Sequence, residues 1–320
     1  MKTQDGQVKI AFLFPGQGAQ QVGMMADLAQ ASAAAREIFH RADEQLGYSL
    51  SQICFNGPAD RLDTTEISQP AMFVCSVAAW EAMKEALGDN APKATVCAGL
   101  SLGEYTALHV AGAIDFSSAL DLVCKRGKFM QESAQSNAGG MVSIIGLEEQ
   151  KVRELCSAAA EGEVLIPANF NCPGQIVISG TANACKRAIE LAPQFGASAA
   201  IPLKVAGAFH SSLMADAAEK LSEVIEKVNF NVPKIPVIAN VDASPYQDAK
   251  SIKEKLIRQM TEPVLWEQSM RRLLDEGVEK FYEIGPGKVL AGLMRRINRQ
   301  IKVESINSAD ALAKLAGQAA

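Results

Sequence analysis

The stretch that decides the fold is residues 95–111, TVCAGLSLGEYTALHVA. Its apolar run at 95–99 predicts a short buried strand, and the spacing of apolar residues over 102–111 predicts a helix directly after it. Ser101 stands between the two elements, flanked by Gly99 and Gly103. A sharp strand-to-helix turn leaves little room for side chains, so glycines fit on both sides, and the turn lifts the serine hydroxyl clear of the sheet. Ser101 is therefore the candidate nucleophile, and the alternative is a serine that only caps the helix.

The same alternation of short apolar runs and longer helical segments continues on both sides, which is typical of a parallel α/β sheet. Further strands are predicted at 9–14, 235–239 and 280–284. Further helices are predicted at 69–87, 116–136, 211–228, 252–260 and 265–276. The first strand ends in a tight loop, Pro15-Gly16-Gln17-Gly18.

The middle of the chain has the order β-α-β-β-α-β, which indicates a ferredoxin-like unit. Its strands are predicted at 141–145, 165–169, 175–179 and 199–203, and its helices at 148–160 and 181–195. We therefore expect a hydrolase-like α/β domain formed by residues 1–137 and 206–320. A small ferredoxin-like domain, residues 138–205, is inserted into it.

Composition narrows the class of protein. The chain has 320 residues and a formal net charge of -5, which argues against general nucleic-acid binding. No apolar stretch reaches the ~18 residues of a membrane span. The segment 1–9 is polar and lacks the apolar run of a secretory signal. The seven cysteines are odd in number and form no CxxC pair, which argues against disulfides and zinc. These features predict a cytoplasmic protein with reduced thiols and no metal.

A serine nucleophile needs a base, and the chain has only three histidines. His40 lies in a charged helical stretch and is expected at the surface. His109 falls within the helix after Ser101 and is expected to pack or face solvent. His210 follows an apolar strand and stands before a predicted helix, where α/β sheets present functional groups. We assign His210 as the base, with a helix-capping role as the alternative; spacing reveals no acidic third member.

Eight motifs resemble those of the malonyl-CoA:acyl carrier protein transacylases of fatty acid synthesis and the related acyltransferase domains of polyketide synthases. They occur over nearly the whole chain in the order of that family. They are FPGQGAQ (14–20), GLSLGEY (99–105), Arg126-Gly127 with Met130-Gln131, NFNCPGQIVISG (169–180), GAFH (207–210), Asn240-Val241-Asp242, PVLW (263–266) and EIGPG (283–287).

The resemblance implies a role for each matching residue. Ser101 would carry the acyl group and His210 would act as its base. The backbone N–H groups of Gln17 and Leu102 would form the oxyanion hole. Arg126 would hold the malonyl carboxylate, although from the sequence alone it could be a solvated helix arginine.

Three further positions are implied in substrate binding or support. Met130 and Asn169 would line the substrate site. The backbone carbonyl of Leu265 would orient His210 in place of a carboxylate. No cofactor and no metal are implied.

Two positions depart from the family pattern. Leu100 stands where many members have histidine, and Leu265 where some have glutamine. Phe209 matches members that select malonyl groups, whereas methylmalonyl-selective members typically have serine there.

The implied reaction is a two-step transfer of malonyl from malonyl-CoA to acyl carrier protein through an acyl-serine. The alternatives are an acyltransferase serving a polyketide synthase, a serine esterase or thioesterase, and a non-catalytic interaction protein. Acyl carrier proteins are acidic, so the basic residues of 295–302 are a candidate docking surface, with a solvated helix face as the alternative. We expect a monomer.

Overall fold

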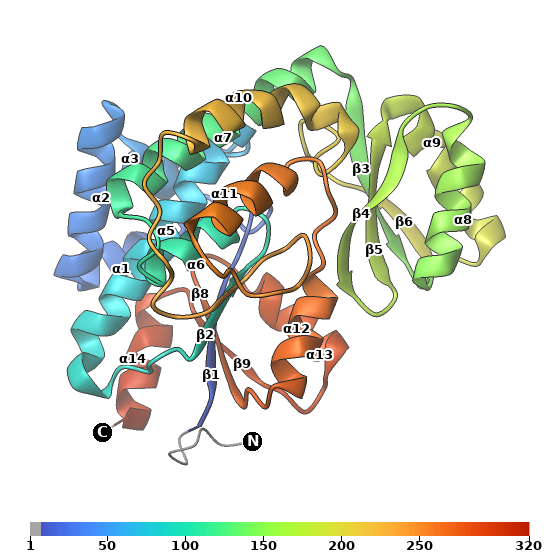
Figure 1. Ribbon diagram of the computed structural model, residues 1–320. Helices are drawn as coiled ribbons and strands as arrows, with labels where there is room; N and C mark the ends of the chain where they lie inside the picture. Colours follow the sequence, from blue (N-terminus) through green and yellow to red (C-terminus); the bar gives the residue numbers. More distant parts are fainter. Residues whose placement is uncertain (1–7, 320) are drawn as a thin grey trace.

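The structure is a computed structural model that describes residues 8–319 in two sheets with surrounding helices (Figure 1). Most of the polar segment 1–9 lies outside the described residues, so the prediction about a secretory signal has no structural counterpart. Among the described helices, none combines the length and the apolar character needed to cross a membrane.

The larger sheet is parallel and has five strands in the order β7-β2-β1-β8-β9. Its strands are β1 (Ile10–Phe14), β2 (Val96–Gly99), β7 (Val237–Ile238), β8 (Lys280–Ile284) and β9 (Val303–Ile306). The four strands predicted from the sequence are present. The fifth, β9, was not predicted, because its sequence VESI is short, has two polar residues at its centre and is only partly buried.

Helices cover this sheet on both sides (Figure 1). Those before and around the nucleophile are α1 (Ala26–Ala31), α2 (Ala33–Leu46), α3 (Leu50–Asn56), α4 (Ala59–Leu62), α5 (Thr65–Leu87), α6 (Gly103–Val110) and α7 (Phe116–Ser136). Those in the last third are α10 (Ala215–Ile225), α11 (Ala249–Arg258), α12 (Trp266–Asp275), α13 (Val289–Ile297) and α14 (Ala309–Ala319). Short 3-10 turns occupy Gly88–Asn90 and Ser212–Met214.

The central helix of the larger unit is α5, which is buried along most of its length. Its middle, residues 70–79, is almost entirely apolar, as expected of a helix enclosed by other elements. Pro70 stands in its second turn. The helix packs against α7 and α2, which fixes the position of α7 and the side chains it carries toward the sheet.

The second sheet is antiparallel and has four strands in the order β4-β5-β3-β6. Its elements follow the predicted order β-α-β-β-α-β: β3 (Gly139–Ile145), α8 (Glu149–Ala160), β4 (Leu165–Cys172), β5 (Gln175–Thr181), α9 (Ala182–Leu191) and β6 (Ala199–Pro202). The predicted helix 181–195 is shorter than expected and ends in a 3-10 turn, Ala192–Phe195, where Pro193 has no backbone N–H to donate. The domain boundaries at 138 and 205 stay a prediction.

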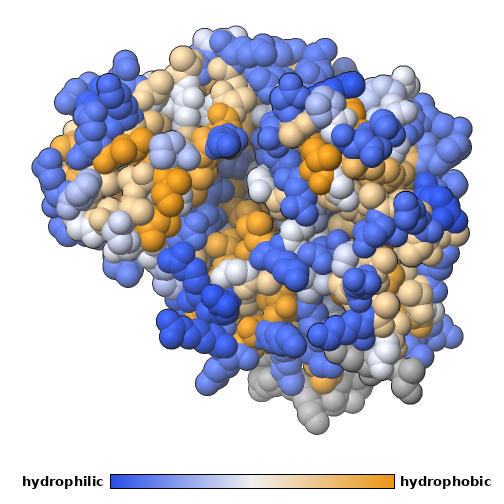
Figure 2. Space-filling view, turned by 180° about the vertical axis from the view of Figure 1, so that it is seen from behind, coloured by the Kyte–Doolittle hydropathy of each residue, from blue (hydrophilic) through white to orange (hydrophobic). Residues whose placement is uncertain are grey.

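The two sheets form separate lobes that meet beside β3 and β4 (Figure 1). From behind, the surface is hollowed between the lobes, and apolar side chains are visible within the hollow (Figure 2). Two backbone hydrogen bonds cross the junction: the Phe170 N–H on β4 donates to the Val264 carbonyl at 2.9 Å, and the Val264 N–H donates to the Ala168 carbonyl on β4 at 2.8 Å. The segment before α12, which contains Val264, is thereby hydrogen-bonded to the smaller lobe.

Candidate active site

Ser101 stands in the turn between β2 and α6 and has a left-handed backbone, with φ of 49°. The flanking glycines are required by space. A Cβ on Gly99 would lie 1.9 Å from the Gly103 carbonyl carbon, and a Cβ on Gly103 would lie 2.0 Å from the Phe14 carbonyl oxygen. The predicted turn is thus present, and it leaves the Ser101 side chain half-buried at the edge of the sheet.

The structure brings His210 to this serine. Its Nε2 lies 2.9 Å from the Ser101 hydroxyl, and its Nδ1 lies 2.7 Å from the backbone carbonyl of Gln259. A carbonyl can only accept, so Nδ1 carries the proton and Nε2 offers its lone pair to the hydroxyl. Burial and the charge of Arg126 lower the pKa of His210 to about 4, although the Gln259 carbonyl opposes this shift. The imidazole is therefore neutral at pH 7 and can accept a proton.

The carbonyl that holds His210 is not the one predicted. Leu265 is the residue before α12, and its carbonyl accepts from the backbone N–H and the hydroxyl of Ser269, at 3.0 and 2.9 Å. It is therefore engaged in the first helical turn. Gln259 follows the last residue of α11, where carbonyl groups lack partners within the helix. A carbonyl rather than a carboxylate does orient the histidine, but it belongs to Gln259.

Arg126 lies on α7 with its side chain at the nucleophile. It is 1 % exposed, which excludes the solvated helix arginine. Its guanidinium donates to the Ser101 hydroxyl at 3.0 Å, to the side-chain oxygen of Gln259 at 2.9 Å and to that of Gln69 at 2.6 Å. Among the described residues its Nε finds no hydrogen-bond partner. The site thus contains a buried guanidinium that has N–H groups available for a further hydrogen-bond acceptor.

The loop with Gln17 lies beside the nucleophile turn. The Leu100 N–H donates to the Phe14 carbonyl at 3.0 Å, and a Cβ on Gly16 would lie 2.3 Å from the Leu100 carbonyl oxygen. This close approach packs the loop that contains Gln17 against the turn that contains Leu102. Their role as an oxyanion hole stays a prediction.

Within residues 8–319, the two remaining predicted positions form no hydrogen bond with Ser101 or His210. Met130 is buried on α7, where its sulfur accepts from the side-chain amide of Gln69 at 3.2 Å. Asn169 lies on β4 and pairs with Val264 at the junction of the lobes. Met130 therefore supports a partner of Arg126, and substrate contact by either residue stays a prediction.

Four polar residues that sequence reasoning gave no role complete the site: Gln69, Glu104, Asn240 and Gln259. Asn240 accepts from the Ser101 N–H and donates to the Gly99 carbonyl, both at 2.7 Å. Glu104 and Asn240 belong to motifs quoted above, so the motifs could have indicated a role for them. The sequence gives no such indication for Gln69 and Gln259, because neutral amides also occur commonly at helix surfaces.

The other histidines have the predicted places. His40 is exposed and lies 3.6 Å from Glu44 on the same helix. His109 is half-buried and packs against Phe73, Trp80 and Phe116. Neither contacts the nucleophile. No group of three acidic, histidine or cysteine side chains suited to a metal occurs within residues 8–319.

Together these groups suit the attack of a serine on an acyl group that carries a negative charge. A neutral imidazole can take the hydroxyl proton, and a buried guanidinium compensates an anionic acyl group that leaves water.

Comparisons with known proteins agree with this chemistry. Residues 11–317 match the model of the acyl transferase domain family. Malonyl CoA-acyl carrier protein transacylases of Bacillus subtilis and Escherichia coli are 45 % and 43 % identical over 305 residues, which cover 95 % of this chain and 95 % and 98 % of theirs.

Solved structures are equally similar. The malonyl CoA-acyl carrier protein transacylase of Coxiella burnetii has a TM-score of 0.93 at 40 % identity, with 97 % of this chain and 98 % of that chain covered. A malonyl-transacylase solved in complex with a type II polyketide acyl carrier protein has the same score and identity, with 97 % and 99 % covered. The chain belongs to the malonyl CoA-acyl carrier protein transacylases of the acyl transferase family.

Proposed function

We propose that this protein transfers a malonyl group from malonyl-CoA to the pantetheine thiol of holo-acyl carrier protein through a malonyl ester on Ser101, and so supplies fatty acid biosynthesis. The observation that carries the proposal is the buried guanidinium of Arg126, 3.0 Å from the Ser101 hydroxyl. Malonyl differs from acetyl by a carboxylate, and a guanidinium can bind both oxygens of that group.

In the first step the Ser101 hydroxyl passes its proton to Nε2 of His210 and attacks the thioester carbonyl. The negative charge on the carbonyl oxygen is stabilised by the backbone N–H groups of Gln17 and Leu102. The C–S bond then breaks, and coenzyme A leaves with the proton from His210. The ester that remains on Ser101 is the intermediate.

The second step runs in the reverse sense with a different thiol. The pantetheine thiol of the carrier gives its proton to His210 and attacks the ester carbonyl. The C–O bond to Ser101 breaks, and the serine takes the proton back. No redox change occurs and no metal is needed for either step.

The carrier would dock at a basic cluster formed by Arg295, Arg296 and Arg299. These exposed residues line a cavity of about 610 Å³ together with Pro173 of the β4–β5 hairpin. Arg296 donates to the side chain of Gln175 at 3.2 Å, so the cluster bridges α13 and the smaller lobe. Complementary charge raises association rates with an acidic partner.

The experiment that tests this function follows the discharge of the acyl-enzyme. The protein is loaded with malonyl-CoA and freed of excess substrate, and its mass is then followed with holo-acyl carrier protein, apo-carrier or buffer. A transferase loses the label rapidly to the holo-carrier only. Rapid loss to buffer would instead identify a thioesterase, the alternative from another reaction class. Carriers from fatty acid and polyketide synthases, compared in the same assay, separate the two supply roles.

We also infer a cytoplasmic monomer. All seven cysteines are free thiols, which suits a reducing compartment. Every side chain assigned to the reaction comes from one chain, so the site needs no second copy. With a net charge of -5, we expect no general nucleic-acid binding.

A further inference from the structure

Glu104 is a buried acidic side chain that the two acyl-transfer steps do not use. It lies in the first turn of α6, three residues after the nucleophile, and is 1 % exposed. Its carboxylate accepts from the Tyr246 hydroxyl, from the Gln259 side-chain amide at 2.5 Å and from the Asn240 N–H at 3.2 Å. All three partners donate, so the ionised carboxylate matches its surroundings.

Gln259 leads from Glu104 to the reacting residues. Its side-chain oxygen accepts from Arg126, and its backbone carbonyl accepts from His210. Its amide nitrogen donates to Glu104 and, at 3.0 Å, to the Ser101 carbonyl. Arginine can only donate, so it requires the oxygen of this amide on its own side. Glu104 requires the nitrogen on the opposite side, and the two charges together fix the orientation of the amide.

Asn240 forms a second connection. Its backbone N–H donates to Glu104, while its side chain bonds the backbone on both sides of the nucleophile turn, at Ser101 and Gly99. The left-handed backbone at Ser101 costs free energy unless its surroundings hold it. Glu104 thus contacts two residues that each restrain the nucleophile turn.

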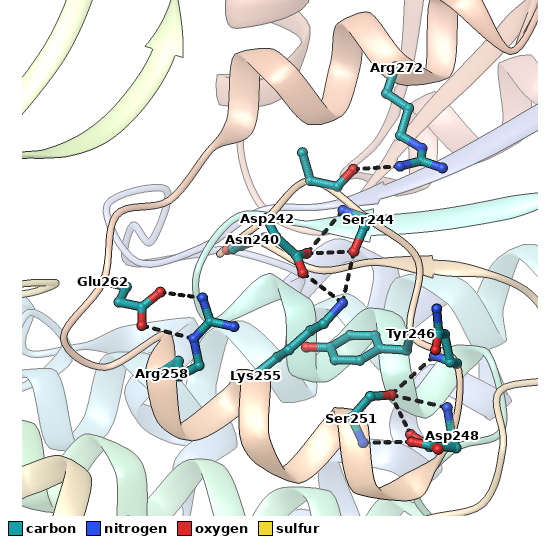
Figure 3. A network of polar contacts seen from close by, with 12 residues as sticks. Asn240, Asp242, Ser244, Tyr246, Asp248, Ser251, Lys255, Arg258, Glu262 and Arg272 are labelled. Carbon is teal, nitrogen blue, oxygen red and sulfur yellow. Dashed lines mark hydrogen bonds and ion pairs between the residues drawn. The ribbon is translucent and has the colours of Figure 1, made fainter.

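The loop that carries Asn240 and Tyr246 is itself anchored to α11 (Figure 3). Lys255 reaches the Asp242 carboxylate at 2.9 Å and the Ser244 hydroxyl at 2.8 Å. Its ammonium also lies 5.4 Å from the centre of the Tyr246 ring. Tyr246 therefore points inward to Glu104 from a loop held in place on its outer side.

We propose that Glu104 is a positioning residue for acyl transfer: by accepting hydrogen bonds from Gln259 and Asn240, its carboxylate holds Arg126, His210 and the Ser101 turn in their reactive arrangement. This proposal rests on the proposed function and deepens it. Glu104 touches neither the substrate nor the reacting atoms.

The titration of Glu104 gives this role a measurable signature. Burial raises the pKa of Glu104 to about 7, against the opposing effects of Tyr246, Gln259, Asn240 and the charge of Arg126. The other titratable groups around it are Tyr105 on the same helix and His210 beyond Gln259; Lys255 lies behind Tyr246.

Protonation of Glu104 is expected to slow malonylation. Above its pKa the carboxylate is ionised and accepts from all its partners. Below its pKa, one carboxylate oxygen of Glu104 is protonated and no longer accepts a hydrogen bond in the same way. The hydrogen bond from Gln259 or from Asn240 is then weakened. His210 stays neutral down to about pH 4. We therefore expect the malonylation rate to fall between pH 7 and pH 5 because Glu104 is protonated. The further fall expected near pH 4 comes from protonation of His210.

The test is the rate of Ser101 malonylation per acylatable site, measured by rapid quench and intact mass from pH 5 to 9. Normalising to the amount of acylatable protein removes any difference in folding yield. For Glu104→Gln we expect a rate about 10-fold or more lower at pH 8, the scale of one lost charged hydrogen bond. We also expect the fall between pH 7 and pH 5 to vanish. The phosphate of coenzyme A titrates near this range, but equally with both proteins.

Two more variants keep the result unambiguous. Glu283 is a matched control, since it is fully buried and accepts from the N–H groups of Leu290 and Ala291 away from the nucleophile. Glu283→Gln should keep both the rate and the fall in rate between pH 7 and pH 5, which is called the acid limb below. Tyr246→Phe removes a hydrogen bond that lowers the pKa of Glu104, so it should move the acid limb to higher pH.

An unchanged rate and an unchanged acid limb in Glu104→Gln would overturn the proposal, as would the same loss in Glu283→Gln. An unmoved acid limb in Tyr246→Phe also contradicts it. If the wild type took no malonyl label at all, the proposed function itself would be wrong. A labelled wild type with an unaffected Glu104→Gln is a failure of the Glu104 role alone.

Discussion

At the scale of single residues, the proposed selection of a malonyl group rests on Arg126. Its side-chain partners Gln69 and Gln259 are neutral, so among the described residues the guanidinium charge beside Ser101 is compensated at longer range, by Glu104. A malonyl carboxylate would supply that compensation on binding.

Arg126→Ala should therefore reduce malonyl transfer by about 100-fold or more, the scale of a lost charged pair. Acetyl transfer should fall far less than malonyl transfer, because an uncharged acyl chain makes no use of the arginine and is affected only through the lost hydrogen bond to Gln259. Arg126→Lys should recover part of the loss, since an ammonium restores the charge without the two-point grip. The measurement is the ratio of malonyl to acetyl transfer in the three proteins. Equal loss of both activities in Arg126→Ala would assign the arginine to the fold instead.

His210 has a separate role that its own variant can isolate. His210→Ala should slow malonylation of Ser101 by about a thousandfold, because the hydroxyl then has no base. Binding of malonyl-CoA should persist, since Arg126 remains in place. Rapid-quench labelling measures the first quantity and titration of a non-acylating analogue the second. Unslowed labelling would show that another group takes the proton.

At the scale of elements, the nucleophile turn depends on the contact of α6 with the end of β1. A Cβ on Gly103 would meet the backbone oxygen of Phe14, which cannot move without shifting the sheet. Gly103→Ala should lower the free energy of unfolding by about 1–3 kcal/mol, as overpacking does, and slow labelling of the folded protein.

Gly292 is the matched control, because it lies in α13 and a Cβ there meets open space. Gly292→Ala should raise the free energy of unfolding by about 0.5–1 kcal/mol through helix propensity. Chemical denaturation followed by circular dichroism measures both changes. Equal effects of the two substitutions would contradict the steric account of the turn.

The same elements mark what the sequence could predict. Strands such as Lys280–Ile284 and the helix Phe116–Ser136 were placed to the residue, because each has a strong apolar pattern and clear boundaries. The short helices α1, α3 and α4 were not predicted, since six, seven and four residues give too few turns for a period.

The site residues also differ in whether the sequence could predict them. Ser101 and His210 could be predicted, because the residues around each of them indicate a turn or a loop that follows a strand. The partner of His210 was misplaced by six residues, at Leu265 instead of Gln259. A backbone carbonyl exists at every position, so only the course of the chain decides which one faces the imidazole.

At the scale of the whole molecule, the site draws on segments far apart in sequence. Ser101 precedes the smaller lobe in the chain. His210 lies eight residues after the end of β6, the last strand of that lobe. The smaller lobe also meets α13 at the basic cluster. The proposed docking surface and the reacting residues can therefore be tested separately by mutation.

Charge reversal tests that separation. Arg295→Glu with Arg296→Glu should raise the KM for holo-acyl carrier protein about tenfold at low salt and leave labelling by malonyl-CoA unchanged. Lys151→Glu with Arg153→Glu, on α8, makes the same change in net charge as a control and should alter neither. Unchanged carrier kinetics at low salt would support the solvated helix face.

Intact-protein mass spectrometry after brief mixing with malonyl-CoA shows whether Ser101 carries the malonyl group. We expect one malonyl adduct on the wild type, mapped to the peptide containing Ser101, and none on Ser101→Ala. A Ser101→Ala protein that still gained the adduct would contradict this role of Ser101.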